Sequence, residues 1–356
     1  MSRRSRAPLR VAVLGAGTVG REVVAALCER ATELSAADGT PLTLAGIAIR
    51  DVARARAAGM PPDLLTDAPA HLVASPDTDV IVELMGGEEP ARTLIAAALT
   101  AGKAVVTANK HVIAHHGAEL ETLARRTGAA LRFEASVGGG IPVLGPIATE
   151  LAGNRLTAVR GIVNGTTNYI LTAMADEGRD YDEVLAAAQA AGYAEADPSG
   201  DVEGHDAVNK LVILARLAFG VWLDPADVIT VATEGPGAGR PGITGVGAAD
   251  LAAARASGGV IKLIAEAVRA TAGGSPTAGV LPRVVDAGSA LGRTAGVLNR
   301  IEVDGDPVGT VAFSGPGAGG PATSSAVLGD LVAIANGLGS TWAGLPPAIV
   351  AVAVAR

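Results

Sequence analysis

Residues 193–210, YAEADPSGDVEGHDAVNK, hold five carboxylates and end on a lysine. Asp206 and Lys210 are four residues apart, so on a helix that continues into the following apolar run they project together. Pro198 ends the preceding helical segment, and the turn could bring Glu195 back toward this helix. Acids and a lysine in one cleft could bind the ammonium and an oxygen of an amino-acid-like substrate. The pattern is also typical of a capped, salt-bridged helix start in solvent, so both interpretations stay open.

A second lysine, Lys110, follows the apolar run 104–108. If that run is a strand of a parallel sheet, Lys110 lies at the carboxyl edge, where doubly wound folds bind their ligands. There it could polarise a carbonyl oxygen or bind a carboxylate. A lysine at this point is equally typical of a solvated surface.

A glycine-rich loop, GAGTVG, lies at 15–20 between a strand-like run and a helical pattern. The G-x-G-x-x-G spacing allows a tight turn, close approach of a pyrophosphate and packing of the helix on the sheet. Its position after a strand and before a helix predicts a dinucleotide site. The residues that would contact the cofactor are Gly15, Gly17, Thr18, Val19 and Gly20.

The second strand-like run ends in Arg50 and Asp51, and Arg54 and Arg56 follow. Arginines at this point suit the 2′-phosphate of NADP(H), which we favour, whereas Asp51 suits a bare ribose and leaves NAD(H) open. Alternatively, Arg50 pairs with a nearby carboxylate on a solvated face.

Other reactive side chains form weaker patterns. His111 and His115 are four residues apart and His116 adjoins them, but no further ligand with zinc-site spacing accompanies them. Cys28 falls on the helix after the glycine loop, where a structural role is expected rather than that of a nucleophile.

The elements that must position these residues change in character near residue 140. Before it, apolar runs alternate with Ala-rich helical segments, which predicts an α/β fold with a Rossmann-type, doubly wound parallel sheet over 1–140. These strand-like runs are 9–14, 42–49, 79–87, 103–110 and 128–140. Over 141–313 longer helices mix with strands, which predicts a second, α+β domain, and 314–356 would return to the nucleotide-binding domain. The expected helices are 181–191, 203–219 and 247–256, and the expected strands 157–163, 260–268, 280–285, 296–303 and 308–313.

Composition excludes several classes of function. The chain has 356 residues, a net charge of −8 and no long basic run, which argues against nucleic acid and anionic membranes as partners and favours a small polar substrate. The longest apolar stretch, 211–223, is too short to span a bilayer and contains Arg216. A single cysteine and no apolar leader indicate the cytoplasm.

Several motifs together resemble the homoserine dehydrogenase family over about residues 9–337: GAGTVG, VVTANK, FEASVGGGIP, GIVNGTTNYIL, GYAEADPSGDVEGHDAVNKLVILA, GGVIKLIAEA and GPGAGGPATSSAVLGDL. The resemblance implies reversible, NAD(P)-dependent reduction of L-aspartate 4-semialdehyde to L-homoserine, a step toward threonine, methionine and isoleucine. It also implies a homodimer formed through the second domain.

The resemblance assigns roles to individual residues. Lys210 matches the proton-transferring lysine, Lys110 a second active-site lysine, and Glu195 and Asp206 the acids that hold the substrate. Residues matched to positions near the substrate are Thr166, Thr167 and Tyr193, and those matched to the cofactor site are Lys110, Gly86, Gly192, Gly317 and Gly319. The stretch 134–141 resembles a sodium-binding loop that uses the carbonyls of Val137, Gly139 and Ile141, with Glu134 nearby. Alternatively, it is only a flexible interdomain turn.

The C-terminal segment after 337 is shorter than the regulatory domain that many members append, and no aspartate kinase region is present. We therefore expect a monofunctional enzyme without threonine feedback through such a domain. Two rival hypotheses are another amino-acid or hydroxy-acid dehydrogenase of the same fold and a catalytically silent NADP-binding sensor. Retention of Lys110, Glu195, Asp206 and Lys210 argues against the sensor. Cys28 is misplaced for a dehydrogenase that forms an acyl phosphate.

Overall fold

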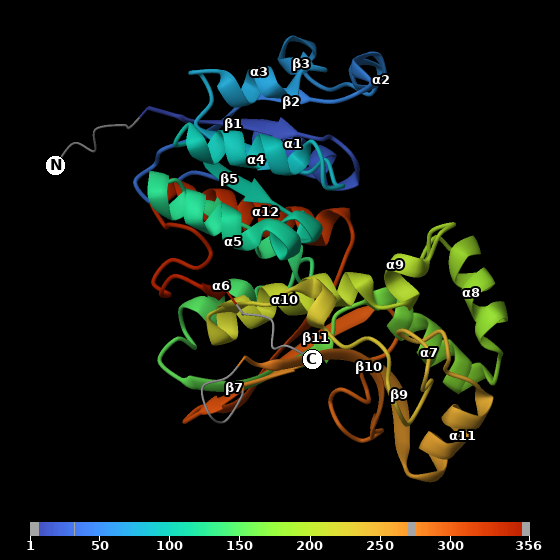
Figure 1. Cartoon of the computed structure of the whole chain (residues 1–356). Coiled ribbons are helices and arrows are strands. Elements are labelled where there is room, and N and C mark those ends of the chain that lie inside the picture. The colour runs from blue at the N-terminus through green and yellow to red at the C-terminus, as the bar shows by residue number, and fades with distance from the viewer. Residues whose placement is uncertain (1–6, 32, 270–274, 351–356) are drawn as a thin grey trace. The chain divides into compact units, whose positions relative to one another are not determined.

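The computed structural model describes residues 7–31, 33–269 and 275–350, and it divides the chain into two compact units (Figure 1). The first comprises Met1–Ala148 and Ala318–Pro347, and the second comprises Thr149–Gly317 and Ala348–Arg356. The sequence placed these divisions after residues 140 and 313. Ile349 and Val350 belong with the second unit because they form β13, which pairs in parallel with β8 (Val221–Trp222).

The first unit is a doubly wound parallel sheet, as predicted. Its six strands have the order β3-β2-β1-β4-β5-β6. The strands are β1 (Leu9–Leu14), β2 (Leu42–Ala48), β3 (Leu65–Thr66), β4 (Val80–Glu83), β5 (Ala104–Thr107) and β6 (Leu131–Arg132). The order reverses between β1 and β4, so the ligand crevice of such a sheet lies at their carboxyl ends.

Helices cover both faces of this sheet (Figure 1). The helices of this unit are α1 (Thr18–Glu29), α2 (Val52–Ala57), α3 (Pro69–Ala74), α4 (Ala91–Thr100), α5 (Lys110–Thr127), α6 (Leu144–Ala148) and α12 (Gly320–Ala335), with short 3-10 helices η1 (Pro62–Leu64) and η2 (Glu134–Ser136). On one face α4 packs against α5, and on the other α1 packs against α12. Val327 and Leu331 of α12 are fully buried in the same core as Val23 of α1, so the chain returns after some 300 residues to complete this unit.

The run 128–140 was expected to be a strand, but only Leu131 and Arg132 are in one. The backbone then turns into η2 because Glu134 directs its carboxylate back onto the start of α6. Beyond α12 the chain covers the short edge strand. Thr341 N donates to Leu131 O (3.0 Å), and the rings of Trp342 and Phe133 pack with their centroids 5.3 Å apart. Such cover protects an edge from pairing with other chains.

The second unit is an antiparallel sheet with helices, as predicted for an α+β domain. The sheet has the order β10-β9-β7-β11-β12. Its strands are β7 (Arg155–Ile162), β9 (Gly259–Val268), β10 (Thr277–Asp286), β11 (Leu298–Asp306) and β12 (Gly309–Pro316). The helices are α7 (Gly165–Glu177), α8 (Tyr181–Ala190), α9 (Ser199–Val202), α10 (His205–Phe219) and α11 (Ala248–Ala256), with the 3-10 helix η3 (Pro225–Asp227).

Helix α10 is the central helix of the second unit. Every residue from Ala207 to Phe219 is buried, and the helix contacts β7, β9 and β10. Helix α7, which was not expected from the sequence, lies beside it on the sheet through β9 and β11. Both helices carry residues that the sequence matched to the substrate site near their N-termini: Thr166 and Thr167 on α7, and Asp206 and Lys210 on α10.

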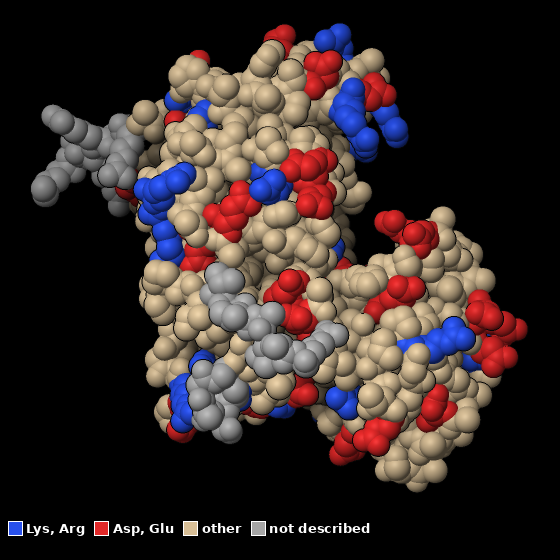
Figure 2. Space-filling view, viewed as in Figure 1, with Lys and Arg blue, Asp and Glu red and all other residues tan. Residues whose placement is uncertain are grey.

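The surface carries interspersed charges of both signs on the face shown in Figure 2. Arg216 is fully buried within α10, inside the apolar stretch 211–223. Within the described ranges, no helix combines the length and apolarity needed to cross a membrane.

Candidate functional site

Lys210 and Asp206 form a largely buried ion pair at the start of α10. Lys210 is 8% exposed, and its Nζ donates to Asp206 Oδ2 at 2.8 Å and to the carbonyl of Val163 at 2.6 Å. The helix begins after Gly204, whose φ of 92° lies in the left-handed region that favours glycine. The i, i+4 spacing therefore places the ammonium directly beside the carboxylate.

Two further residues, Asn164 and Asp201, join this pair. Asn164 is the N-cap of α7: its Oδ1 accepts from the backbone N–H of Thr167 at 2.8 Å. Its Nδ2 donates to Asp201 Oδ1 at 2.7 Å and to Asp206 Oδ2 at 2.8 Å. Sequence reasoning missed both residues. The signal for Asn164 was its position directly before GTTNYIL, since asparagine is a preferred N-cap.

The other residues matched to the substrate lie at different depths. Thr166 Oγ1 donates to Tyr193 O at 2.9 Å, and Tyr193, 48% exposed, packs on Tyr169 at 4.8 Å. Thr167 is 1% exposed, and its hydroxyl is bonded to Asn164, so it serves the cap of α7. Glu195 lies in an exposed loop, where its carbonyl accepts from Gln189. The structure therefore groups Asp206 with Lys210 but does not bring the Glu195 carboxylate into hydrogen-bond contact with them.

The glycine loop of the first unit has the steric constraints of a dinucleotide site. Gly15 has a φ of 96°, and a Cβ there would lie 2.6 Å from Leu84 O. A Cβ at Gly20 would lie 2.0 Å from Gly15 O, whereas one at Gly17 would meet nothing within 4 Å. Two glycines thus allow the turn and the packing of α1, and the third leaves the loop open to a ligand.

A second helix N-terminus adjoins this loop. A Cβ at Gly320, the first residue of α12, would lie 3.1 Å from Thr18 Cγ2 at the start of α1. Gly319, with a φ of 110°, is the N-cap of α12. Both helices therefore direct the positive ends of their dipoles to the same place, which favours an anion such as a pyrophosphate. Of the other matched glycines, Gly86 lies in the loop after β4 with a φ of 72°, whereas Gly192 follows α8 and Gly317 packs against Asn299 in the second unit.

Lys110 is the first residue of α5, directly after the N-cap Asn109. Asn109 Nδ2 donates to the carbonyl of Gly87 at 2.8 Å, which connects the loops that follow β4 and β5. Beneath them Glu83, fully buried, accepts from Thr107 Oγ1 at 2.6 Å and from the N–H of Met85 at 2.7 Å. Burial raises the pKa of the Glu83 carboxyl above its ordinary value, and the hydrogen bonds to it act in the opposite direction. Glu83 was not singled out from the sequence, although it ends a buried strand at the ligand edge.

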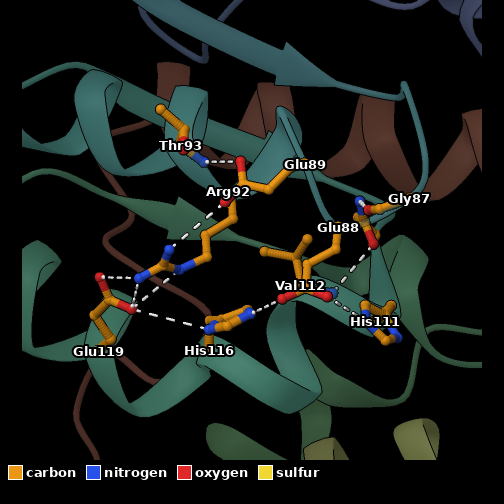
Figure 3. A network of polar contacts seen from close by, with 10 residues as sticks. Gly87, Glu88, Glu89, Arg92, Thr93, His111, Val112, His116 and Glu119 are labelled. Atoms are coloured by element: carbon orange, nitrogen blue, oxygen red, sulfur yellow. Dashed lines mark hydrogen bonds and ion pairs between the residues drawn. The ribbon is translucent and has the colours of Figure 1, made fainter.

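Two of the three clustered histidines, His111 and His116, contact the carboxylate of Glu88 (Figure 3). His116 Nε2 lies 2.8 Å from Glu88 Oε1, and His111 Nε2 lies 3.4 Å from Glu88 Oε2. The hydrogen bond from His116 lowers the pKa of Glu88. His115 stacks on His111 at 4.2 Å. Among the described residues, no group of three or more His, Cys, Asp and Glu side chains is arranged to hold a metal ion.

Arg50 and Asp51 follow β2 and differ in their contacts. Asp51 is the N-cap of α2, where its Oδ1 accepts from the N–H of Arg54 at 2.8 Å. Its carboxylate is therefore already used in the fold. Arg50 lies at the same strand end and is exposed.

The loop 134–141 is built around a buried carboxylate. Glu134 accepts from three backbone N–H groups at the start of α6: Val143 (2.7 Å), Leu144 (2.8 Å) and Gly145 (2.8 Å). Asp330 accepts from the N–H of Glu134 at 2.8 Å and pairs with Arg132 at 2.7 Å. Burial raises the pKa of both carboxyls, so this region disfavours its own negative charge.

A buried lysine braces α7 on the sheet. Lys262 of β9 is 4% exposed, and its Nζ donates to Asn168 Oδ1 at 3.0 Å and to Thr294 O at 2.7 Å. Asn168 in turn donates to Gly296 O at 2.9 Å. Burial lowers the pKa of Lys262 to about 8, and the more distant Asp176 acts in the opposite direction. The helix whose cap holds Asp206 is thus fixed at its second turn as well.

Comparisons with known proteins agree over nearly the whole chain. Residues 15–134 match the family model described as homoserine dehydrogenase, NAD binding domain, and residues 142–332 match that described as homoserine dehydrogenase. The homoserine dehydrogenase of Mycobacterium leprae is 47% identical over 92% of this chain and 72% of its own length, and that of Corynebacterium glutamicum is 44% identical over the same shares. The crystal structure of a homoserine dehydrogenase from Thiobacillus denitrificans superposes with a TM-score of 0.87 at 36% identity, covering 96% of this chain and 79% of that one. A hyperthermophilic archaeal homoserine dehydrogenase in complex with NADPH gives 0.74 at 26% identity, covering 92% and 97%.

Lys262 makes stability depend on alkaline pH in a defined direction. Since its folded pKa of about 8 lies below the ordinary 10.5, the folded state binds fewer protons than the unfolded chain between these values. The free energy of unfolding therefore gains from this group as pH rises through that window, by at most about 3 kcal/mol. Denaturant unfolding of wild type and Lys262→Met at pH 8 and pH 10 should show the smaller rise in the variant. Equal rises would contradict the role of burial, because titration of the tyrosines is common to both proteins.

Proposed function

The chain belongs to the homoserine dehydrogenase family and is an NAD(P)-dependent oxidoreductase, and from this premise we propose how its residues carry out the reaction. The proposal is that it interconverts L-aspartate 4-semialdehyde and L-homoserine in the biosynthesis of threonine, methionine and isoleucine. The observation that carries the mechanism is the buried group in which Lys210 contacts Asp206 and the Val163 carbonyl.

Lys210 is proposed as the proton donor in reduction and the acceptor in oxidation. The bound nicotinamide supplies or accepts the hydride. Negative charge develops on the aldehyde oxygen during reduction, and an ammonium within hydrogen-bond reach stabilises it and transfers a proton. Asp206 and Val163 O hold the ammonium in one position, which limits the reorganisation that the reaction requires. Lys110, at the ligand edge of the other unit, is proposed as a second active-site lysine.

The acids are proposed to recognise the substrate as an amino acid. Asp206 pairs with the Lys210 ammonium, and Asp201 shares the Asn164 amide with Asp206, so two carboxylates and one ammonium leave net negative charge for a substrate amino group. Glu195 is proposed to add a third from its exposed loop, with Thr166 and Tyr193 beside it. This requires the 193–198 loop to close over the substrate.

NADP(H) is proposed as the preferred cofactor. Asp51, the residue that would suit a bare ribose, is already used as the cap of α2, whereas Arg50 lies at the strand end where a 2′-phosphate binds in this fold. The NADPH complex of the archaeal relative supports this choice.

A sodium ion is proposed at the loop 134–141. Burial raises the pKa of the Glu134 and Asp330 carboxyls, and a further cation beside Arg132 would favour their ionised forms. No hydrogen bond within the described residues uses the carbonyls of Val137, Gly139 or Ile141, which are hard oxygen donors of the type that such an ion takes. The ion would stabilise the loop and the two carboxylates.

A cytoplasmic homodimer formed through the second unit is also proposed. Ile229 and Val268, which are 56% and 39% exposed, line a groove on β9 and β10. Apolar side chains on such a sheet surface are typical of subunit contacts.

Replacement of the active lysine tests the reaction. Lys210→Ala should lower kcat for L-homoserine oxidation by about 10²–10⁴-fold with the KM for cofactor little changed, because the proton acceptor is lost. The rate is followed by absorbance of the reduced nicotinamide, with Lys103→Ala as the control and folding checked by circular dichroism. Wild type without turnover in either direction would refute the function, and a fully active variant would refute the lysine's role.

Arg50→Ala tests the cofactor preference. Loss of a charge-assisted contact with the 2′-phosphate should raise the KM for NADP(H) by about 10–100-fold and leave that for NAD(H) unchanged. Arg126→Ala, an exposed arginine near the end of α5, is the matched control. Equal effects on both cofactors would contradict the assignment.

Thermal unfolding in sodium chloride and in choline chloride at equal ionic strength tests the ion site. Sodium should raise Tm saturably, by about 2–4 °C for each kcal/mol of linked binding energy, and Glu134→Gln should reduce the response. Glu150→Gln, an exposed carboxylate, should keep it. The same Tm in both salts would exclude the site.

A further inference from the structure

We propose that Asn164 is a positioning residue for proton transfer: its carboxamide sets the geometry and the charge of the group formed by Asp201, Asp206 and Lys210. The inference rests on the proposed function, because it assumes that Lys210 transfers the proton. It goes beyond that function by naming the neutral side chain on which the lysine's environment depends.

The carboxamide of Asn164 is 5% exposed and used on both sides. Its Oδ1 accepts from the backbone N–H (2.8 Å) and the hydroxyl (2.9 Å) of Thr167. Its Nδ2 donates to one oxygen each of Asp201 (2.7 Å) and Asp206 (2.8 Å). A flipped amide would place its oxygen against two carboxylates and its N–H groups against a backbone donor. The contacts therefore determine the orientation of the side chain.

Two adjacent residues at the start of α7 contact the carboxylates and the lysine: Asn164 contacts both acids, and Val163 contacts Lys210. Asp206 Oδ2 accepts from both Asn164 Nδ2 and Lys210 Nζ. The other protein acceptor of Lys210 is the carbonyl of Val163, the residue before Asn164. The direction of the ammonium is thus coupled to the position of residues 163 and 164 at the start of α7.

Charge balance explains why an amide is needed there. Asp201 and Asp206 converge on one nitrogen, whose two N–H groups each satisfy an oxygen of one carboxylate. Lys210 then faces the carboxylate of Asp206 in a partly desolvated place. A third carboxylate at 164 would repel both acids and stabilise the protonated lysine.

The two functions of Asn164 can be separated by substitution. Capping α7 needs only the side-chain oxygen, and aspartate is as good an N-cap as asparagine. Asn164→Asp therefore keeps the cap, removes both N–H donors and adds a charge. Asn164→Ala removes the cap and the donors without adding charge. Asn154→Asp makes the same chemical change at a side chain whose N–H group donates to Leu151 O, away from the acids.

The experiment compares pH–rate profiles of L-homoserine oxidation for wild type and the three variants. Asn164→Asp should move the rising limb of kcat to higher pH by about 1 unit and lower kcat near neutrality by about 10-fold, with the KM for cofactor within twofold of wild type. Asn164→Ala should lose kcat without this displacement to higher pH, and Asn154→Asp should match wild type. A folded Asn164→Asp protein with the wild-type profile would overturn the inference.

A second readout does not depend on turnover. Acetylation by acetic anhydride requires the neutral amine, and its extent at Lys210 can be read by peptide mass spectrometry as a function of pH. Asn164→Asp should shift this labelling curve to higher pH, whereas Asn154→Asp should not. If wild type fails to oxidise homoserine but the labelling curve of Asn164→Asp is displaced from that of wild type, the proposed function alone is refuted. A labelling curve that is the same in Asn164→Asp and wild type would refute the influence of Asn164.

Discussion

The ion pair between Lys210 and Asp206 is the interaction on which the second unit depends. Removing two charges from water is costly, and mutual attraction offsets the cost only when the remaining hydrogen-bonding capacity is also satisfied. Here the Val163 carbonyl and the Asn164 amide supply those contacts. The end of β7, the start of α7 and the start of α10 must therefore meet, and the sheet beneath α7 and α10 holds them together.

The first unit uses buried carboxylates for a related purpose. Glu83 accepts from the loop after β4 and from the last residue of β5, and Glu134 accepts from the start of α6. In each case a carboxylate out of water binds donors from segments that would otherwise be free to move, so its desolvation is offset while a loop is fixed. The position of Lys110 at the start of α5 is set by the neighbouring Asn109, which hydrogen-bonds to the loop after β4.

Helix α12 is far from α1 in the sequence but belongs to the same compact unit. Its Val327 and Leu331 complete the core beside α1, and its N-terminus adjoins the glycine loop. Two helix N-termini can act on one bound phosphate group only because the C-terminal part of the chain returns to this sheet. The unit that binds a dinucleotide is thus made of two separated stretches of sequence.

The sequence by itself determined the features that depend on short-range spacing. Alternating apolar runs predicted the parallel sheet, the glycine spacing predicted the loop at 15–20, and four-residue spacing predicted that Asp206 and Lys210 lie together. The family resemblance, carried by contiguous motifs, was confirmed.

Only the tertiary structure decided which distant groups satisfy one another. Asn164 donates hydrogen bonds to Asp201 and Asp206, which are 37 and 42 residues away in the sequence. Thr167 is a hydrogen-bond partner of Asn164 and does not lie at the surface. The run 128–140 is mostly not a strand, because Glu134 bonds to α6 instead of continuing into the sheet. Periodicity records which side of an element is buried, whereas a buried polar group takes whichever partner the packing of distant segments brings within reach.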